Sequence, residues 1–380
     1  IASPQLARLA AAQKGPTAFV NTPFHARIAQ AYKNGVAWLL AADLHTMVAQ
    51  SAARKPGSAE GLDRSGFSDA EYLVVERKDI AGQTENRAVL SFGQARRGVA
   101  SWLAAPAPIR ALEFISADAA FAASALVKNP AALVQDVFAM AGGSSSGFAN
   151  HLAEFEAKAG ISVQEDLARP LGGEFAFAVD GPMLPMPSWK VVLEVYDPAR
   201  FQQALEKLLE GANRESGMEL AKIAKEDSGG HTYYTVSGAK LPFQVQYVYD
   251  NGFLVAAPNR DLLVRAMEYR TTGYTLSRSA KFTRLLPRDG HTDFSAMVYQ
   301  TLATALGPIA DQVGLTPEQR SSIAAAGPSL VLAYGEQDRI EFASAGTFFG
   351  LRLEQLLGLG AGRPHPAKAP ALRRPEQSQS

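Results

Sequence analysis

The sequence predicts an α+β fold in which repeated strand–helix cassettes form curved antiparallel sheets, with helices packed on one side. Short runs of alternating apolar residues, typical of strands, are joined by turn residues. Several runs then lead through Asn or Asp, often followed by Pro, into an amphipathic helix. Hydrophobic residues make up 47% of the 380 residues, enough for a sizeable core. The clearest cassettes are Ala120–Val127 before Asn129, Trp189–Tyr196 before Asp197, and Phe253–Ala256 before Asn259.

Composition excludes several classes of function. The 37 basic and 37 acidic residues balance to a formal net charge of +0, so no strong field attracts nucleic acid, and we expect no nucleic-acid partner. The chain has 0 cysteines, which removes disulfides, thiolate metal sites and cysteine nucleophiles. No apolar run is long enough to span a bilayer. We expect no cofactor.

We expect three parts along the chain. Residues 1–105 form an N-terminal α+β lobe, and residues 110–360 form a larger lobe of repeated strand–helix units. Residues 361–380 form a disordered Pro/Ala/Gln tail, because no apolar period survives there. The proline-rich stretch 104–109 connects the lobes, since proline cannot lie in a helix interior.

In the first lobe, amphipathic spacing predicts helices at Ser3–Lys14, Pro23–Tyr32 and Gln94–Leu103. The run Val36–Asp43 fits either a strand that enters a helix or one continuous helix to Ala53. Gly, Ser, Pro and charge predict a loop over Arg54–Ser68. A hairpin joins Tyr72–Ile80 to Asn86–Phe92.

In the second lobe, alternation and turn residues predict the strands, and caps predict the helices. In Glu174–Asp180 the residues Phe175 and Phe177 share one face and Ala176 and Ala178 the other. A flexible loop is expected over Gly142–Gly147. The expected strands are Leu112–Ser116, Ala119–Val127, Glu174–Asp180, Trp189–Tyr196, Thr232–Val236, Phe243–Asp250, Phe253–Ala257, His291–Gln300, Leu330–Tyr334 and Arg339–Ala343. The expected helices begin at Pro130, Phe148, Pro198, Asp261, Leu302, Gln319 and Leu351.

Two patterns are candidates for a metal site or a nucleophile. Asp289, His291 and Asp293 project the same way if His291 opens a strand, and such ligands suit a divalent cation. Asp-Gly is also a turn former, and the related stretch Asp227–His231 favours the interpretation as turns. Ser145 lies in a G-x-S-x-G match, but a helix precedes it where a nucleophile elbow needs a strand. A linker is the preferred interpretation there.

Aromatic residues gather in adjacent predicted strands as a candidate ligand-binding platform. Tyr234, Phe243, Tyr247 and Tyr249 carry it, and such rings bind sugars or apolar ligands. Cross-strand packing against the helices explains the same rings and is the favoured alternative.

Three stretches carry a resemblance to a known family, namely Gly35–Asp43, Leu112–Asp118 and Ser295–Tyr299. They resemble an uncharacterised family of large, predicted exported bacterial proteins from acidobacteria-like genomes, with the likeness spread over roughly residues 16–357. The resemblance implies an extracytoplasmic location, in the periplasm or on the cell surface, and it assigns no functional residue. A signal peptide or lipid anchor before Ile1 is compatible with that location.

These observations lead to three hypotheses for function. The first is a non-enzymatic binding or structural protein of the bacterial cell envelope, with other envelope proteins or a second copy as partner. The second is a carrier of an apolar, lipid-like ligand in a cavity lined by Phe175, Phe177, Trp189 and the Tyr247 strand. The third is a hydrolase that uses Ser145 or a metal at His291.

Overall fold

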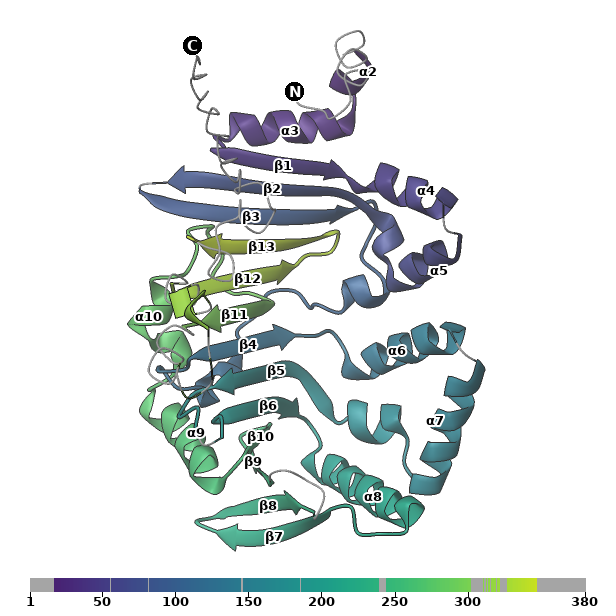
Figure 1. Cartoon of the computed structure of the whole chain (residues 1–380), viewed down its shortest axis with the longest axis vertical. Coiled ribbons are helices and arrows are strands. Elements are labelled where there is room, and N and C mark those ends of the chain that lie inside the picture. The colour runs from purple at the N-terminus through teal and green to yellow at the C-terminus, as the bar shows by residue number, and fades with distance from the viewer. Residues whose placement is uncertain are drawn as a thin grey trace, which may run out of the picture.

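The described part of the chain is built on one large antiparallel sheet. The computed structural model describes residues 17–346 except 55, 81, 145, 185, 239–243 and most of 302–326. Within these residues the sheet has 13 strands, in the order β1-β2-β3-β13-β12-β11-β4-β5-β6-β10-β9-β8-β7 (Figure 1). Helix accounts for 38% and strand for 34%, so the expected α+β class with antiparallel strands is confirmed. Repetition of one strand–helix cassette is not confirmed.

The strands pair without a break from the first to the last in this order. Their bounds are β1 Trp38–Asp43, β2 Ala70–Ile80, β3 Gln83–Phe92, β4 Phe121–Leu126, β5 Leu171–Val179, β6 Trp189–Val195, β7 Lys222–Ser228, β8 His231–Ser237, β9 Val245–Asp250, β10 Phe253–Ala257, β11 Ala296–Gln300, β12 Ser329–Gly335 and β13 Arg339–Ala345. Strand β3 pairs with β13, so the expected N-terminal lobe and the larger lobe both contribute to this sheet.

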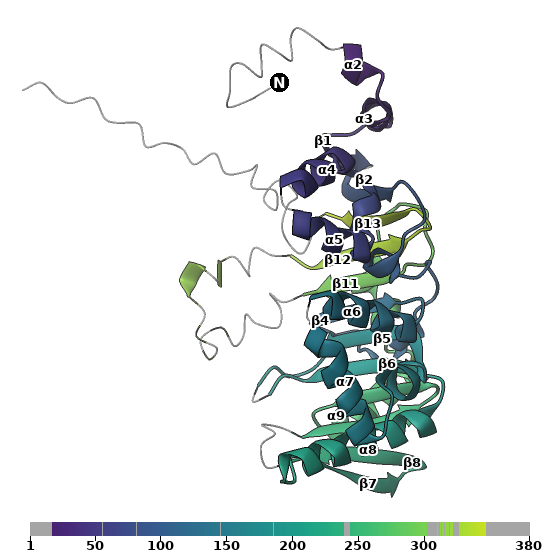
Figure 2. The same cartoon turned by 90° about the vertical axis from the view of Figure 1, so that its right-hand side faces the viewer.

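Helices line both long sides of the sheet. Figure 1 shows α4 to α8 along one side and α9 and α10 along the other, and Figure 2 shows the first group in a line. The α-helices are α2 Thr17–Val20, α3 Pro23–Lys33, α4 Leu44–Arg54, α5 Pro56–Ser65, α6 Pro130–Ser144, α7 Ser146–Ala159, α8 Pro198–Ser216, α9 Arg260–Thr272 and α10 Ala280–Thr283. The 3₁₀-helices are η1 Phe67–Asp69, η2 Gly98–Ser101, η3 Arg110–Phe114 and η5 Leu276–Arg278, and η4 Val163–Ala168 is a π-helix. No helix among the described residues is long and apolar enough to cross a membrane.

The helices contact opposite faces of the sheet, so the expected placement of helices on one side is not confirmed. Leu263 of α9 packs with Val255 of β10 in the largest buried cluster. Phe201 of α8 packs with Leu254, the residue before Val255. Because successive strand residues point to opposite faces, α8 and α9 lie on different faces. We call the face that carries Val255 the covered face and the face that carries Leu254 the apolar face.

A buried ion pair ties the covered face to η3. The Nζ of Lys190, a residue only 1% exposed, lies 2.8 Å from Oδ2 of Asp180 and donates to the carbonyl oxygen of Phe114 at 2.9 Å. The same Asp180 oxygen accepts from the backbone N–H of Ser116 at 3.0 Å. Burial lowers the pKa of Lys190, and the neighbouring carboxylate opposes that effect. These contacts hold the end of η3 against β5 and β6.

The polar side chains of β5 and β6 explain why the strand expected at Leu112–Ser116 is a 3₁₀-helix with an extended tail. The carboxylate of Glu174 accepts from the backbone N–H of Ala111 at 2.8 Å, so that donor is satisfied without a strand partner. Arg110 bridges the carboxylates of Glu174 and Glu194. Tertiary hydrogen bonds therefore override the local β pattern.

Other local expectations were wrong for similar reasons. The helix expected at Gln94–Leu103 is only η2, because the buried Arg96 side chain donates to three backbone carbonyls, including Ala100 and Leu103. The loop expected at Arg54–Ser68 contains α5, which contacts α4, η2 and α6. The loop expected at Gly142–Gly147 is helical up to Ser144 and again from Ser146. The contacts of α5 override the weak helix propensity of Gly and Ser in its segment.

We expect Lys190→Met to cost about 3–5 kcal/mol of unfolding free energy, because it leaves the Asp180 carboxylate buried without its partner. Urea unfolding followed by circular dichroism measures this loss. Lys281→Met is the matched control, since Lys281 pairs with Asp118 on the surface and such pairs contribute roughly 0–1 kcal/mol. Equal losses in the two variants would show that the buried pair does not hold the sheet to η3.

Candidate functional site

The apolar face carries an unbroken row of apolar side chains across the sheet from β1 to β9. Residues that pair across neighbouring strands point to the same face, so the register identifies the row directly. Its members, each paired with the next, are Leu40, Val75, Ala88, Phe342, Ala333, Ala296, Ala125, Phe175, Leu193, Leu254 and Tyr249. Antiparallel sheets commonly have one core-facing and one solvated, polar face, and this sheet departs from that rule.

A second row runs beside the first and is also apolar. It comprises Tyr234, Tyr247, Ala256, Val191, Phe177, Ala123, Val298 and Val331, again each paired with the next. Phe175 and Phe177 thus share this face, as the alternation in the sequence predicts. Trp189 lies there too, because it pairs with Val179, two residues beyond Phe177.

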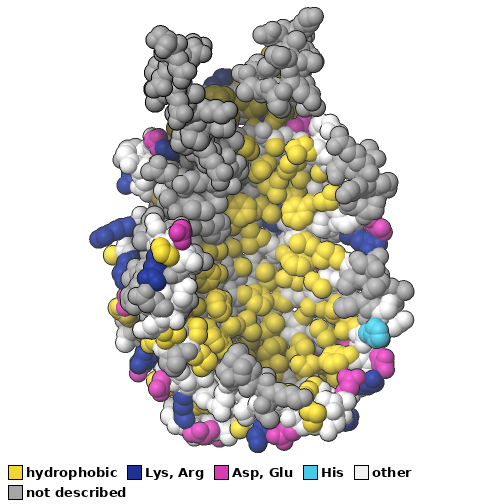
Figure 3. All heavy atoms as spheres, in the orientation of Figure 1, with side chains coloured by type: hydrophobic (Ala, Val, Ile, Leu, Met, Phe, Trp, Pro, Cys, Tyr) yellow, Lys and Arg dark blue, Asp and Glu magenta, His cyan; other side chains and the backbone are white. Residues whose placement is uncertain are grey.

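The described residues leave the middle of the apolar face open and hollowed. Figure 3 shows hydrophobic side chains gathered in a recess along the sheet, with charged side chains at the margins. Phe177 is 40% exposed and Phe342 is 38% exposed. Between them the first row has alanines at three adjacent strands, Ala125, Ala296 and Ala333. We call this recess, with its alanine floor and the phenylalanines on either side, the apolar trough; from Phe342 to Phe175 it spans four strand spacings, about 19 Å.

A tyrosine cluster lies at one end of the apolar face, beside α8. The rings of Tyr234 and Tyr247 stack with centroids 4.9 Å apart, and Tyr249 packs edge-on against both. The hydroxyls of Tyr247 and Tyr249 donate to Oε1 of Gln202 at 2.9 and 3.1 Å. Burial raises the pKa of Tyr247 to about 12 and also raises that of Tyr249. Of the predicted platform, Phe243 lies outside the described residues.

The tyrosine cluster combines both interpretations offered by the sequence. Tyr247 is buried and packs under Phe201, which is the expected packing against a helix. Tyr234 and Tyr249 are only partly buried and line a depression of about 700 Å³ together with polar side chains of α8. Packing therefore explains the inner ring, while the two outer rings border an open space.

The predicted metal ligands lie close together along the chain but form other contacts. Oδ1 of Asp289 accepts from the backbone N–H of His291 at 3.1 Å, and Oδ2 accepts from the hydroxyl of Tyr334 at 2.5 Å. The His291 ring stacks on Tyr334, with centroids 4.2 Å apart, and Asp293 accepts from Thr292. Among the described residues no group of three His, Cys, Asp or Glu side chains could hold a metal ion. The turn-like contact at Asp289 fits the alternative interpretation of this motif.

Asp289 and His291 also border a charged pocket of about 200 Å³ over β2, β3 and β13. Its floor is a ladder of ion pairs, in which Arg87 holds the buried Glu341 through two contacts of 2.5 Å and lies 3.8 Å from Glu76. Burial raises the pKa of Glu85 at its rim. Acidic and basic groups alternate here, so neither sign of charge dominates. The sequence did not indicate this ladder, because it depends on Glu341 of β13, which lies about 250 residues from Arg87 in the chain.

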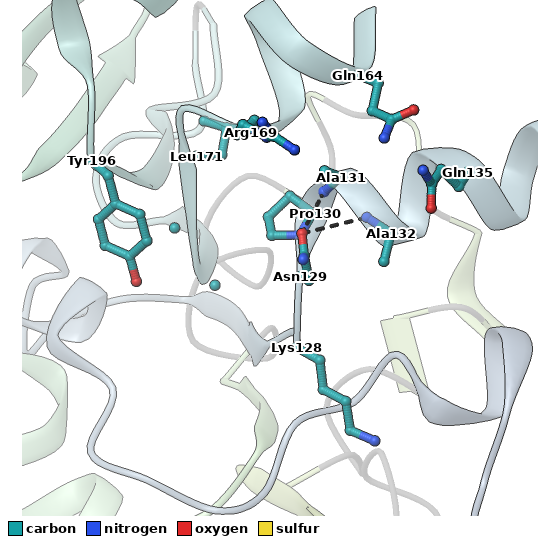
Figure 4. Close-up of a pocket in the computed structure, with 12 residues that line it drawn as sticks. Lys128, Asn129, Pro130, Ala131, Ala132, Gln135, Gln164, Arg169, Leu171 and Tyr196 are labelled. Atoms are coloured by element: carbon teal, nitrogen blue, oxygen red, sulfur yellow. Dashed lines mark hydrogen bonds between the residues drawn. The ribbon is translucent and has the colours of Figure 1, made fainter.

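A second polar pocket, of about 490 Å³, lies where β4 and β5 meet the start of α6. Asn129 caps α6 by accepting from the backbone N–H groups of Ala131 and Ala132 (Figure 4). Lys128 and Arg169 line the same pocket, but Figure 4 shows the Lys128 side chain pointing away from Arg169. The two cations therefore do not converge on one ligand position.

Ser145, the candidate nucleophile, lies outside the described residues. Its neighbours on either side belong to the ends of α6 and α7, so a helix and not a strand comes directly before it. The strand-to-helix context that a nucleophile elbow requires is therefore missing from those neighbours.

The raised pKa of Tyr247 predicts a pH effect on stability. The pKa of this tyrosine is about 10 in the unfolded chain and about 12 in the folded chain. Its contribution to stability is therefore fully present below pH 10 and is lost as the pH rises towards 12. We expect Tyr247→Phe to remove this part of the alkaline loss, measured as the difference in urea midpoint between pH 8 and pH 11. Tyr32→Phe, at an exposed tyrosine, is the control. Equal alkaline losses in wild type and Tyr247→Phe would contradict the prediction.

Comparison with known proteins adds no assignment: no family model matches the chain, and no curated protein or solved structure matches it significantly. The geometry of the apolar face is therefore the strongest evidence on which a function can be based.

Proposed function

We propose that this chain is a non-enzymatic binding protein that carries an apolar, chain-like ligand in the apolar trough. The single observation that carries the proposal is the pair of partly exposed phenylalanines, Phe177 and Phe342, on an otherwise unbroken apolar sheet face. Contiguous exposed apolar surface on a folded chain is typical of a ligand groove or an interaction site. The proposal joins the binding-protein hypothesis to that of a carrier for a lipid-like ligand.

The shape of the trough favours a chain over a compact ligand. Alanines at adjacent strands leave a low floor, while Phe175, Phe177 and Phe342 stand beside it. A long acyl chain laid across the strands would contact this floor along its whole length. Burial of apolar surface from both partners would then supply about 25 cal/mol for each Å² removed from water.

A location in the bacterial cell envelope is part of the proposal. It is supported by the family resemblance and by the absence of cysteine from the sequence. In the envelope, a carrier of apolar molecules would move or store a ligand that is poorly soluble in water. The hydrolase hypothesis remains a prediction from sequence, and the geometry of the described residues gives it no supporting observation.

Filling the trough tests the proposal. We expect cis-parinaric acid to bind the wild-type chain and to quench tryptophan fluorescence, because Trp189 lies on the same face. Ala296→Phe places a ring on the floor and should weaken binding about tenfold, equivalent to about 1.4 kcal/mol. Ala224→Phe on the charged edge strand β7 is the control and should bind as the wild type does.

Two outcomes would contradict the proposal. In the first, Ala296→Phe binds the fatty acid with unchanged affinity. In the second, the wild type binds no chain-like probe, and analytical ultracentrifugation shows instead a dimer that Ala296→Phe dissociates. The trough would then be the contact between two copies of the chain. Native mass spectrometry of the purified protein gives a further check, since a carrier is expected to retain lipid.

A further inference from the structure

We propose that the loop between β5 and β6 docks on the surface of an uncharged lipid bilayer and brings the apolar trough to the membrane. The loop comprises residues 181–188, and we call it the docking loop. Its exposed apolar side chains are Leu184 and Met186, which are 39% and 37% exposed. The docking is a property of the loop alone, whereas its purpose, transfer of the ligand between bilayer and trough, rests on the proposed function.

The described part of the hairpin that carries the docking loop exposes no charged side chain. Between Glu174 and Glu194 the sequence has only two charged residues, Asp180 and Lys190. These two pair with each other at 2.8 Å, and each side chain is only 1% exposed. By contrast, the hairpin of β7 and β8 in the same sheet exposes acidic and basic side chains along β7. A surface without exposed charge suits the apolar part of a bilayer, where an unpaired charge is costly.

The backbone of the docking loop has few hydrogen-bond donors that would lose water on contact with lipid. Three of its residues are prolines, which have no backbone N–H. At its base, the backbone N–H and the hydroxyl of Ser188 both donate to the carbonyl oxygen of Pro182 at 2.9 Å. The backbone N–H of Asp180 donates to the carbonyl oxygen of Ser188 at 3.2 Å and closes the base further. An irregular segment cannot lie in the hydrocarbon core, so we place the loop at the boundary between head groups and acyl chains.

The docking loop adjoins the apolar trough through the ends of β5 and β6. Val179 and Trp189 pair with each other on the apolar face, directly before and after the loop region. Both are only partly buried, and two residues before Val179 lies Phe177, the exposed phenylalanine of the trough. Phe121 pairs with Val179 and packs on Phe177, with ring centroids 6.1 Å apart. Partly exposed apolar side chains therefore lead from the loop to the trough.

The small size of the apolar tip indicates reversible docking. Two partly exposed side chains bury less apolar surface than a single acyl anchor, and one acyl anchor alone gives only reversible binding to a membrane. A carrier needs this property, because it must leave the bilayer once the ligand has entered the trough. Contiguous exposed apolar surface on a folded chain is itself a sign of an interaction site.

Sedimentation with sucrose-loaded phosphatidylcholine vesicles tests the docking. We expect the wild type to bind, with the same affinity between about 50 and 500 mM salt, because no exposed charge contributes. The double variant Leu184→Ser, Met186→Ser should bind about tenfold more weakly, since it removes the apolar tip. The double variant Met47→Ser, Met218→Ser is the matched control, because both methionines are exposed elsewhere, and it should bind as the wild type does. If the loop variant does not fold, the single variant Leu184→Ser replaces it, with a loss of about threefold expected.

Binding of cis-parinaric acid without vesicles separates the docking from the function beneath it. We expect the loop variant to bind the free fatty acid as the wild type does, but to take it up several-fold more slowly from loaded vesicles. A wild type that binds the fatty acid and no phosphatidylcholine vesicle would overturn the docking and leave the carrier standing. A wild type that binds vesicles and no fatty acid would leave the docking standing and overturn the transfer.

Three further results would overturn the docking. The first is equal vesicle binding by the loop variant and the wild type. The second is binding that requires anionic lipid and is lost at high salt, which would assign the contact to a basic surface instead. The third is a loop variant that no longer binds free fatty acid, because the loop would then belong to the ligand site itself.

Discussion

The register of the antiparallel sheet is the constraint on which the rest of this structure depends. Alternation assigns each side chain to one face, and pairing aligns those faces from β1 to β7. In this chain both faces of the central strands carry apolar residues. On β10, for example, Val255 faces one way and Leu254 and Ala256 the other, and all three are buried. The helices cover one face fully along β5, β6 and β10, while the described residues leave the middle of the other accessible.

Charged residues determine which face is covered. On the covered face, Lys190 and Asp180 form a buried pair, and Glu174 and Glu194 share Arg110. Each of these contacts reaches η3 or the residues next to it, so the network specifies one partner segment for that face. The two rows of the apolar face between β4 and β12 contain only apolar residues. That surface can make hydrophobic contacts, but it has no charged group that would select one segment of the chain as its partner. This property is expected of a face that binds a ligand.

Much of the local structure could be predicted from the sequence, and the long-range order could not. The hairpin of β2 and β3, the placement of Phe175 and Phe177 on one face, and the caps at Asp197 and Asn259 all follow from short-range rules. The β3–β13 pairing joins residues about 250 positions apart, and no local pattern encodes it. Strand β7 has mostly charged, exposed residues and no apolar alternation, so the pattern that identifies other strands misses it.

The same short-range rules predicted part of the candidate site. Tyr247 and Tyr249 could be assigned to one face of a strand, because they lie two residues apart, and Tyr234 could be assigned to an adjacent strand. The trough could not be located, because its floor is made of alanines on β4, β11 and β12, which are adjacent only through long-range pairing. An alanine in a strand gives no sign of whether it lies under a helix or beside open space.

Alanine has opposite roles on the two faces, and this links the composition to the proposed function. Ala122, Ala176 and Ala178 are buried on the covered face, in the same cluster as Leu112 and Phe114 of η3. Small side chains there let η3 approach the sheet closely. Ala125 and Ala296 occupy the equivalent central strands on the opposite face, where nothing in the described chain packs as closely, and both remain only partly buried. Larger residues at these positions would fill the recess and remove the channel between the phenylalanines. Alanine therefore lets a helix approach on one face and leaves a groove on the other. The abundance of alanine is explained only when each face is considered separately. The open face is the one that leaves room for a ligand.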